Sequence, residues 1–439
     1  MFSTPAGIAV SPALTGLRLA PRIALVMADE MEITVSRPAG TARDEEPTFP
    51  RYDGPAFLSY GFRPFFLGAA LFAGLAVPAW VWVFAGVGEV EFLYRPREWH
   101  VHEMLFGFLP AVMAGFLLTA IPNWTEQAPL RGLPLLSLFL LWLAGRLFMA
   151  WPRPGASAAA VVDTAFLVIV AAFVWWQIAA AGRWDRAPIG VLISLYAGAN
   201  GWFHLLVLRG AATDLPERLA LAVMLLLLTL IGGRIIPTFT GEFLEQQNQA
   251  GPPVSSHIDV LTILLVLAAA VTWIIRPESM AAGGLLILAG SASGIRLLRW
   301  RGWRTWREPL VLILHVGYAW VALSLLALGG AALGIGLPAG NAVHVLTGGA
   351  VGAMTLAVMT RASLGHTGRP RHADGFTVVI YALVNVGALL RVLTPNAEAP
   401  TALTHWMLGA AALGWSGAYL LFALVYGPIV IRRSLDEAE

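Results

Sequence analysis

Residues 99–125 read Trp-His-Val-His-Glu-Met-Leu-Phe-Gly-Phe-Leu-Pro-Ala-Val-Met-Ala-Gly-Phe-Leu-Leu-Thr-Ala-Ile-Pro-Asn-Trp-Thr. After its first five residues this stretch contains no charged side chain, and it is long enough to cross a bilayer as a helix. His100, His102 and Glu103 stand at its beginning. Because ionisable groups at membrane depth are costly and usually functional, the stretch predicts a transmembrane helix that carries part of a functional site.

The composition extends this interpretation to the whole chain of 439 residues, of which 58% are hydrophobic and 12% are charged. A soluble domain has about a quarter of its residues charged, so the sequence predicts an all-α polytopic integral membrane protein with about twelve transmembrane helices. Residues 61–439 are expected to form this single domain, and residues 1–60 a disordered cytoplasmic leader. The predicted spans are 64–87, 101–121, 132–151, 157–181, 187–209, 216–237, 257–275, 278–298, 308–329, 340–361, 373–393 and 401–431.

The distribution of arginine predicts the orientation in the membrane. All 28 basic residues counted as Lys or Arg are arginine, and most of them fall on the side that holds the N-terminus. By the positive-inside rule, both termini are expected in the cytoplasm. The outer ends of the spans then carry the histidines at positions 100, 102, 204, 344 and 405. One loop on the cytoplasmic side contains Arg296, Arg299, Arg301, Arg304 and Arg307.

The chain contains no cysteine and has a formal net charge of +2. The lack of cysteine excludes disulfides, iron–sulfur clusters, thiolate-ligated or covalently attached haem, and blue-copper sites. A metal in this protein must therefore be held by histidine, methionine or carboxylate side chains. The small net charge gives no reason to expect a nucleic-acid partner.

Three of the outer histidines, His100, His204 and His344, stand on helix faces that contain small residues such as glycine and alanine. Small residues let a flat group or another backbone approach closely, and imidazole is a ligand for haem iron and for copper. Their repetition at one depth predicts that the three side chains approach one another around a shared prosthetic group, haem b. The alternative is that each is an interfacial side chain that hydrogen-bonds to a neighbouring helix.

Three charged residues near these histidines have two interpretations each. Arg97 and Arg209 are at the right level to neutralise haem propionates, or they are ordinary flanking charges that extend to the interface. Glu103 either caps the helix through its dipole, which is the favoured interpretation, or orients a ligand imidazole.

The His-Val-His spacing predicts that two imidazoles serve different sites. Residues two apart on a helix are separated by about 200°, so His100 is expected on the small face that includes Gly107, and His102 on the bulky face that includes Leu109. His100 is then the preferred haem ligand, and His102 either binds a second metal, copper, or hydrogen-bonds to a neighbouring helix. If residues 99–102 are still loop, both rings converge on one metal. The candidate metal ligands are His100, His102, His204 and His344.

Four stretches resemble the NnrS family of bacterial inner-membrane proteins, which is tied to the nitric oxide response and associated with haem and copper. They are residues 63–66, residues 99–107 continuing to 122–125, residues 233–240 and residues 359–369. The resemblance implies a twelve-helix protein of the inner membrane, distantly similar in layout to the core subunit of haem-copper oxidases. The oxygen chemistry of that enzyme is not implied, because its copper site uses clustered histidine pairs and this sequence contains no His-His pair.

Three functions remain open from the sequence alone. A haem protein that binds or processes nitric oxide, or protects against nitrosative stress, would take this small apolar ligand from the lipid and show a Soret band that shifts with it. A transporter would bind a polar solute without metal, although the two halves show no detectable repeat and the midplane has few charges. A scaffold or assembly factor would hand haem or copper to another complex and hold its metal loosely. Metal analysis with an optical spectrum separates the three.

Overall fold

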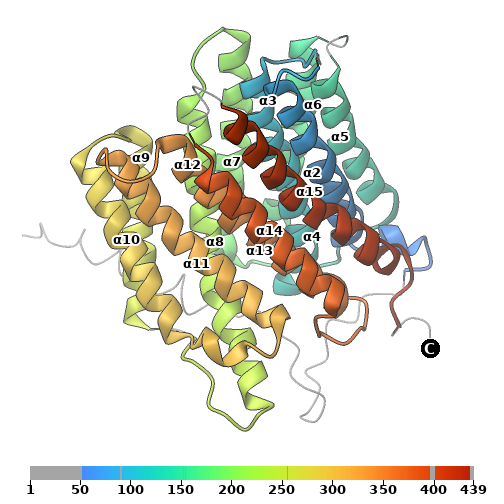
Figure 1. Ribbon diagram of the computed structural model, residues 1–439. Helices are drawn as coiled ribbons and strands as arrows, with labels where there is room; N and C mark the ends of the chain where they lie inside the picture. The colour runs from blue at the N-terminus through green and yellow to red at the C-terminus, as the bar shows by residue number, and fades with distance from the viewer. Residues whose placement is uncertain are drawn as a thin grey trace, which may run out of the picture.

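The computed structural model describes residues 52–88, 91–151, 153, 155–254, 256–395 and 401–435. Every regular element in these ranges is helical, and twelve helices or helix runs are long and apolar enough to cross a membrane (Figure 1). The predicted all-α, multi-pass membrane fold is therefore confirmed. Residues 1–51 of the predicted leader lie outside the described residues, whereas Ala56–Leu58 forms a short 3-10 helix, η2, in which Leu58 is buried.

Most of the spans are single α-helices, and two are interrupted by a π-helix. The single helices are α2 (Phe62–Phe84), α5 (Gly132–Ala150), α6 (Ala156–Ala180), α7 (Ala187–Leu208, after the 3-10 helix η4, Trp184–Arg186), α8 (Asp214–Glu245), α9 (His257–Ile275), α10 (Met280–Arg299), α11 (Pro309–Ala332, after the 3-10 helix η5, Gly302–Thr305), α14 (Gly375–Leu393) and α15 (Ala402–Ile431). The second span consists of α3 (Pro96–His102), the π-helix η3 (Glu103–Phe108) and α4 (Leu109–Thr125). The tenth consists of α12 (Ala339–His344), the π-helix η6 (Val345–Val351) and α13 (Gly352–Gly365).

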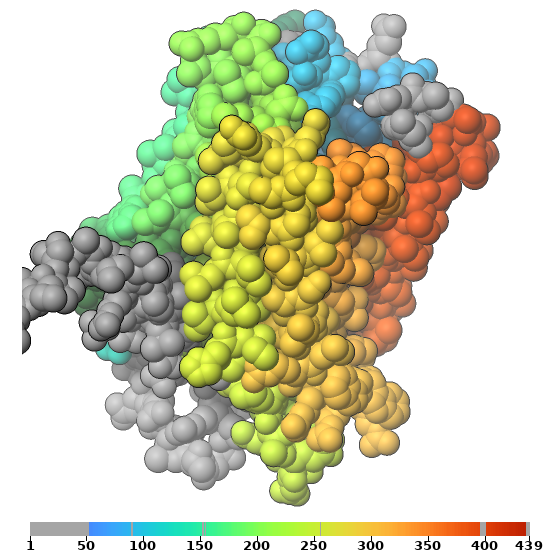
Figure 2. Space-filling model, turned by 90° about the vertical axis from the view of Figure 1, so that its left-hand side faces the viewer, coloured from blue at the N-terminus to red at the C-terminus, as the bar shows by residue number. Residues whose placement is uncertain are grey.

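Three spans form the centre of the bundle. The comparison uses the most apolar part of each span. There, 83% of the residues are buried in the second span (Pro96–Thr125), and 72% are buried in α8 and in the tenth span (Ala339–Gly365). In α2 and α5 the share is 33%. The outer helices expose many Leu, Val, Ile and Trp side chains, which suits a surface in contact with lipid. Figure 2 shows one face of the molecule, on which α9 and α10, coloured yellow, stand in front; α9 packs against α8 and α10, and α10 packs against α11. Side chains on the three central spans are therefore the ones most shielded from lipid.

The two π-helices occupy equivalent places in their spans. In each case a short α-helix ends at a histidine, His102 or His344, and the π-helix begins at the next residue. A π-turn inserts extra backbone into a helix and turns the residues before it relative to those after it, and such turns often mark functional sites. Both irregularities lie at the end of the membrane where the sequence places its outer histidines.

Side chains from neighbouring helices satisfy the backbone of η3. Pro110 follows it and has no N–H to donate to a preceding carbonyl. The Tyr196 hydroxyl donates to the Leu105 carbonyl, and the Trp142 indole N–H donates to the Gly107 carbonyl at 2.9 Å. The irregular backbone at this depth is thus tolerated because it is buried in protein and hydrogen-bonded.

Two helix boundaries differ from those expected by five residues or more. The second span begins at Pro96 and not at residue 101, because proline is compatible with the first helical position, where no intrahelical donor is needed. The expectation that Pro237 ends the sixth span is wrong, since α8 continues through it to Glu245. A proline inside a transmembrane helix is tolerated where packed neighbours and local adjustments compensate for the lost hydrogen bond.

Candidate cofactor and metal sites

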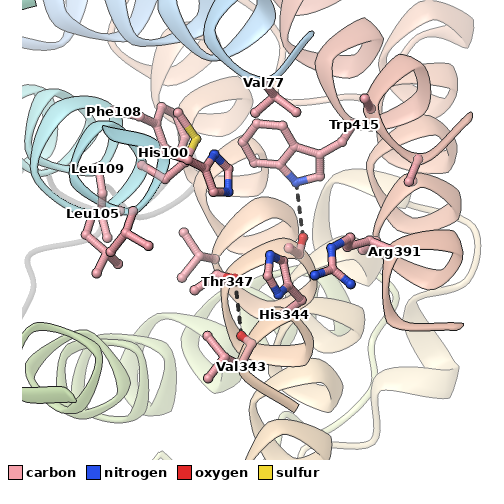
Figure 3. A pocket seen from close by; sticks show the side chains of 18 of the residues that line it. Val77, His100, Leu105, Phe108, Leu109, Val343, His344, Thr347, Arg391 and Trp415 are labelled. Carbon is pink, nitrogen blue, oxygen red and sulfur yellow. Dashed lines mark hydrogen bonds between the residues drawn. The ribbon is translucent and has the colours of Figure 1, made fainter. Parts of the chain in front are cut away.

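The larger cavity lies between the second and tenth spans, near the predicted outer side. Its empty space, including the part that opens to the surroundings, amounts to about 1100 Å³, and its walls are mostly aliphatic or aromatic. His100 and His344 both line it, and Figure 3 shows their rings approaching the cavity from different helices, with Arg391 beside His344. Both histidines are half-buried, as expected when one side of each ring faces the cavity.

The His344 ring is oriented by its own helix. Its Nδ1–H donates to the carbonyl oxygen of Gly340 at 2.6 Å. In a neutral imidazole the proton on Nδ1 leaves Nε2 with a free lone pair, which is the arrangement of most metal-ligating histidines. His344 is therefore prepared to act as a ligand through Nε2.

The His100 ring is held by stacking. Its centroid lies 4.1 Å from that of the Trp80 ring, with an interplanar angle of 25°. Within the described residues no hydrogen bond involves this imidazole, and Nδ1 is buried without a partner. A buried polar nitrogen without a partner carries a desolvation cost that a bound ligand can relieve.

Arg391 supplies a positive charge to the same cavity. It belongs to the last turn of α14, lines the cavity and is half-buried. Among the described residues no carboxylate pairs with its guanidinium. An unpaired cation in a low-dielectric site is costly, so this position favours a ligand with an anionic group. From the sequence Arg391 is indistinguishable from an arginine that flanks a span.

The two arginines expected to neutralise propionates lie elsewhere. Arg97 makes two hydrogen bonds to the Glu217 carboxylate, at 3.1 and 3.0 Å, and Glu217 lines the cavity. Arg97 itself does not line the cavity, but its partner Glu217 does. Arg209 is exposed at the end of α7 and is not among the lining residues.

A second polar cluster lies behind α3, away from the cavity. Its centre is formed by His102, Asp163 and His204, which are all buried and lie close enough to hold a metal ion. His102 Nε2 is 3.1 Å from His204 Nε2 and 3.2 Å from Asp163 Oδ2, and His204 Nε2 is 3.1 Å from the same oxygen. Three donor atoms from α3, α6 and α7 therefore converge on one point.

Four further side chains surround this centre. Glu103 accepts a hydrogen bond from His102 Nδ1–H at 2.9 Å, and Tyr94 lies 2.6 Å from His204 Nδ1. Burial raises the pKa of the Tyr94 hydroxyl, so the phenol stays protonated. The side chains of Asn200 and Arg146 complete the shell.

The helix-cap interpretation of Glu103 is wrong. Because α3 begins at Pro96, Glu103 stands beyond the first turn, where it is fully buried and contacts His102 and Arg146. The orienting interpretation agrees with this geometry. Asp163 and Arg146 were not assigned from the sequence, although charged residues inside predicted spans are themselves a signal of function.

The structure separates the predicted set of histidines into two groups. His100 and His344 share a cavity, whereas His204 lies with His102. The rings of His100 and His102 do face different neighbours, as the helical spacing predicts, and residues 99–102 are helical and not loop. The predicted faces further along are wrong, because η3 intervenes. A Cβ on Gly107 would clash with Arg146, so Gly107 faces the polar cluster, while Leu109 lines the cavity.

A second, smaller cavity, with about 630 Å³ of empty space including its open part, continues along the central spans toward the predicted cytoplasmic side. Leu109 and Met224 line both cavities, so the two adjoin. Apart from the side chain of Thr355 and the backbone of Gly232, its lining residues carry apolar side chains only. This space suits a small apolar molecule.

Comparison with known proteins supports the family resemblance. The family model described as NnrS protein matches residues 56–434, which is most of the chain. The matched region contains all twelve spans, the residues that line the large cavity and the residues of the polar cluster. No curated protein matches the sequence.

Proposed function

This chain belongs to the NnrS family, and we propose that it is a haem protein of the bacterial inner membrane that binds nitric oxide. Family membership supports a role in the nitric oxide response in general. The observation that carries the more specific proposal is the cavity into which His100, His344 and Arg391 all project, and no carboxylate in the described part of the chain pairs with Arg391.

The residues of this cavity fit a haem. Ligand sites are typically concave and mostly apolar with a few polar groups, and this cavity combines apolar walls with a few ionisable groups, among them two imidazoles and one guanidinium. His100 and His344 would hold the iron, and Arg391 would neutralise a propionate. The bulky apolar walls, including Phe108 and Trp415, suit the faces of a macrocycle. When bound, the haem supplies an iron atom that takes a diatomic ligand.

The two imidazoles are not equally anchored. The Gly340 carbonyl fixes the His344 ring and increases its basicity through Nδ1–H. The His100 ring has only the stacking contact with Trp80. We expect His344 to be the permanent ligand and His100 to be the side chain that moves away when a small ligand binds.

The properties of nitric oxide match the apolar access to this site. It is small and apolar, so it partitions into lipid and needs no polar channel. The second cavity, which adjoins the first at Leu109 and Met224, offers it an apolar path through the centre of the bundle. Most arginines lie on the side of the membrane that holds both termini, which supports a cytoplasmic location for the termini. The haem would then lie nearer the outer surface.

The proposal is tested on protein purified from haem-replete cells. We expect about one haem b per chain by pyridine haemochrome assay, and a Soret band that shifts when nitric oxide is added. His344→Ala should lose most of the haem and His100→Ala a large part of it. The control is His366→Ala, because His366 follows α13 at the opposite end of the tenth span. A colourless wild-type protein, or equal haem loss in all three variants, contradicts the proposal.

A further inference from the structure

The cluster of His102, Asp163 and His204 contains more hydrogen-bond acceptors than donors. Glu103 is a carboxylate and can only accept, so the proton of neutral His102 is on Nδ1 and its Nε2 is an acceptor. Asn200 Nδ2 donates to Asp163 Oδ2 at 2.7 Å, which turns the amide oxygen Oδ1 toward His102 Nε2 at 3.2 Å. His102 Nε2 is thus surrounded by other acceptors.

With both imidazoles neutral, a single proton at the centre cannot satisfy this arrangement. The one remaining candidate donor at the centre is His204 Nε2, if Tyr94 donates to Nδ1 of that ring. His204 could donate that proton either to His102 Nε2 or to Asp163 Oδ2. In both cases the contact between His102 Nε2 and Asp163 Oδ2, which lie 3.2 Å apart, would still join two acceptors. Buried acceptors that face one another without a donor are destabilising.

We infer that this centre binds one first-row transition-metal ion through His102 Nε2, His204 Nε2 and Asp163 Oδ2. The three atoms form a nearly equilateral triangle with sides of 3.1, 3.1 and 3.2 Å. An ion with metal–ligand bonds of roughly 2.0–2.1 Å would lie about 1 Å above its plane, which is the geometry of three ligands on one face of a tetrahedral or octahedral ion. The amide oxygen of Asn200 lies beside the triangle as a fourth ligand.

The charges of the cluster also favour a cation. Glu103 and Asp163 contribute two carboxylates, and among the described residues Arg146 is the arginine that pairs with both. With neutral imidazoles the group has a net charge of −1 in a fully buried position, which is costly. Arg146 takes one oxygen of Asp163, namely Oδ1, and leaves Oδ2 directed at the centre.

The residues around the triangle hold its ligands in place. Glu103 fixes the His102 ring through Nδ1, and with a metal bound the Nδ1–H of His204 donates to the Tyr94 oxygen. Metal-ligating histidines almost always have such a partner on the second ring nitrogen. The site is independent of the haem proposal, because none of its three ligands lines the large cavity.

Metal analysis of the purified full-length chain tests this inference. We expect about one equivalent of copper, zinc or iron in excess of haem iron, and the metal found identifies the occupant. After removal with a chelator, the protein should take up one equivalent of Zn²⁺. His204→Ala and Asp163→Asn should lose this equivalent and keep the haem spectrum of the wild type.

A milder variant keeps the test decisive if those chains fail to fold. Tyr94→Phe removes only the partner of His204, and it should weaken Zn²⁺ binding by roughly 10- to 100-fold. His257→Ala, at the exposed start of α9, is the control for adventitious binding and should bind as the wild type does. Wild-type protein that holds no more Zn²⁺ than His204→Ala or, where that chain does not fold, than Tyr94→Phe, overturns the inference.

Discussion

At the scale of single residues, the partner of each ionisable group decides what that group is available to bind. His344 donates to a carbonyl and keeps its other nitrogen free, while Arg97 is already engaged by Glu217. Arg391 has no carboxylate partner among the described residues. Arg391 is therefore the positive charge in the large cavity with which an anionic group of a ligand can pair.

Removal of that charge should weaken haem binding without unfolding the protein. A hydrogen bond to a charged group contributes about 1.5–3 kcal/mol, so Arg391→Gln should lower haem affinity roughly 10- to 100-fold. Arg391→Lys should retain much of it, because the positive charge remains. The measurement is haem transfer from the protein to apomyoglobin, followed at the Soret band. The matched control is Arg209→Gln, an exposed arginine at the same side, and equal haem loss from both variants would reject the role of Arg391.

At the scale of elements, the two π-helices set the direction in which the histidines point. Apolar run lengths were sufficient to predict the twelve spans, and ionisable residues at span ends identified His100, His102, His204 and His344 as candidate site residues. The grouping of these residues was not predictable from a 3.6-residue period, because η3 and η6 change the register within their spans. The π-turns depend on packing with Tyr196, Trp142 and Trp415, which periodicity does not show.

Asp163 was predictable and Arg391 was not, for different physical reasons. Asp163 interrupts an apolar run inside a predicted span, where a carboxylate needs a partner. Arg391 stands at a span end, where most arginines extend to the interface, and only the tertiary structure shows that it turns inward.

The η6 segment provides a test of this control over direction. A Cβ on Gly349 would lie 2.5 Å from the Trp320 ring, and Trp320 is held by a 2.7 Å hydrogen bond to Asn385. Gly349→Ala should therefore displace η6 together with His344. We expect a stability loss of about 1–3 kcal/mol and a lower haem content, measured by thermal unfolding and by the Soret absorbance. Gly284→Ala on α10, where a Cβ meets nothing within 4 Å, is the control and should change neither; unchanged haem content in Gly349→Ala would contradict the prediction.

At the scale of the whole molecule, the three most buried spans line both cavities, which lie one after the other from the predicted outer side toward the middle of the bundle. α4, α8 and α13 contribute most of the lining of the second cavity. Methionine and aliphatic side chains form its walls, so a polar solute or a proton gains nothing by passing through it. The arrangement separates this apolar cavity from the buried charges of the His102, Asp163 and His204 cluster.

Closure of the second cavity should slow ligand binding at the haem and leave haem content unchanged. Val358→Phe adds a ring to its wall, at a distance from the first cavity, which Val358 does not line. If ligands reach the haem through this space, the bimolecular rate of CO or nitric oxide binding after flash photolysis should fall several-fold, and geminate rebinding should increase because the escape volume is smaller. Leu264→Phe, on the exposed side of α9, adds the same kind of bulk outside the cavity and should have no effect. Equal rates in Val358→Phe and the wild type, at equal haem content, would mean that the ligand enters the first cavity directly from the lipid or from the outer surface.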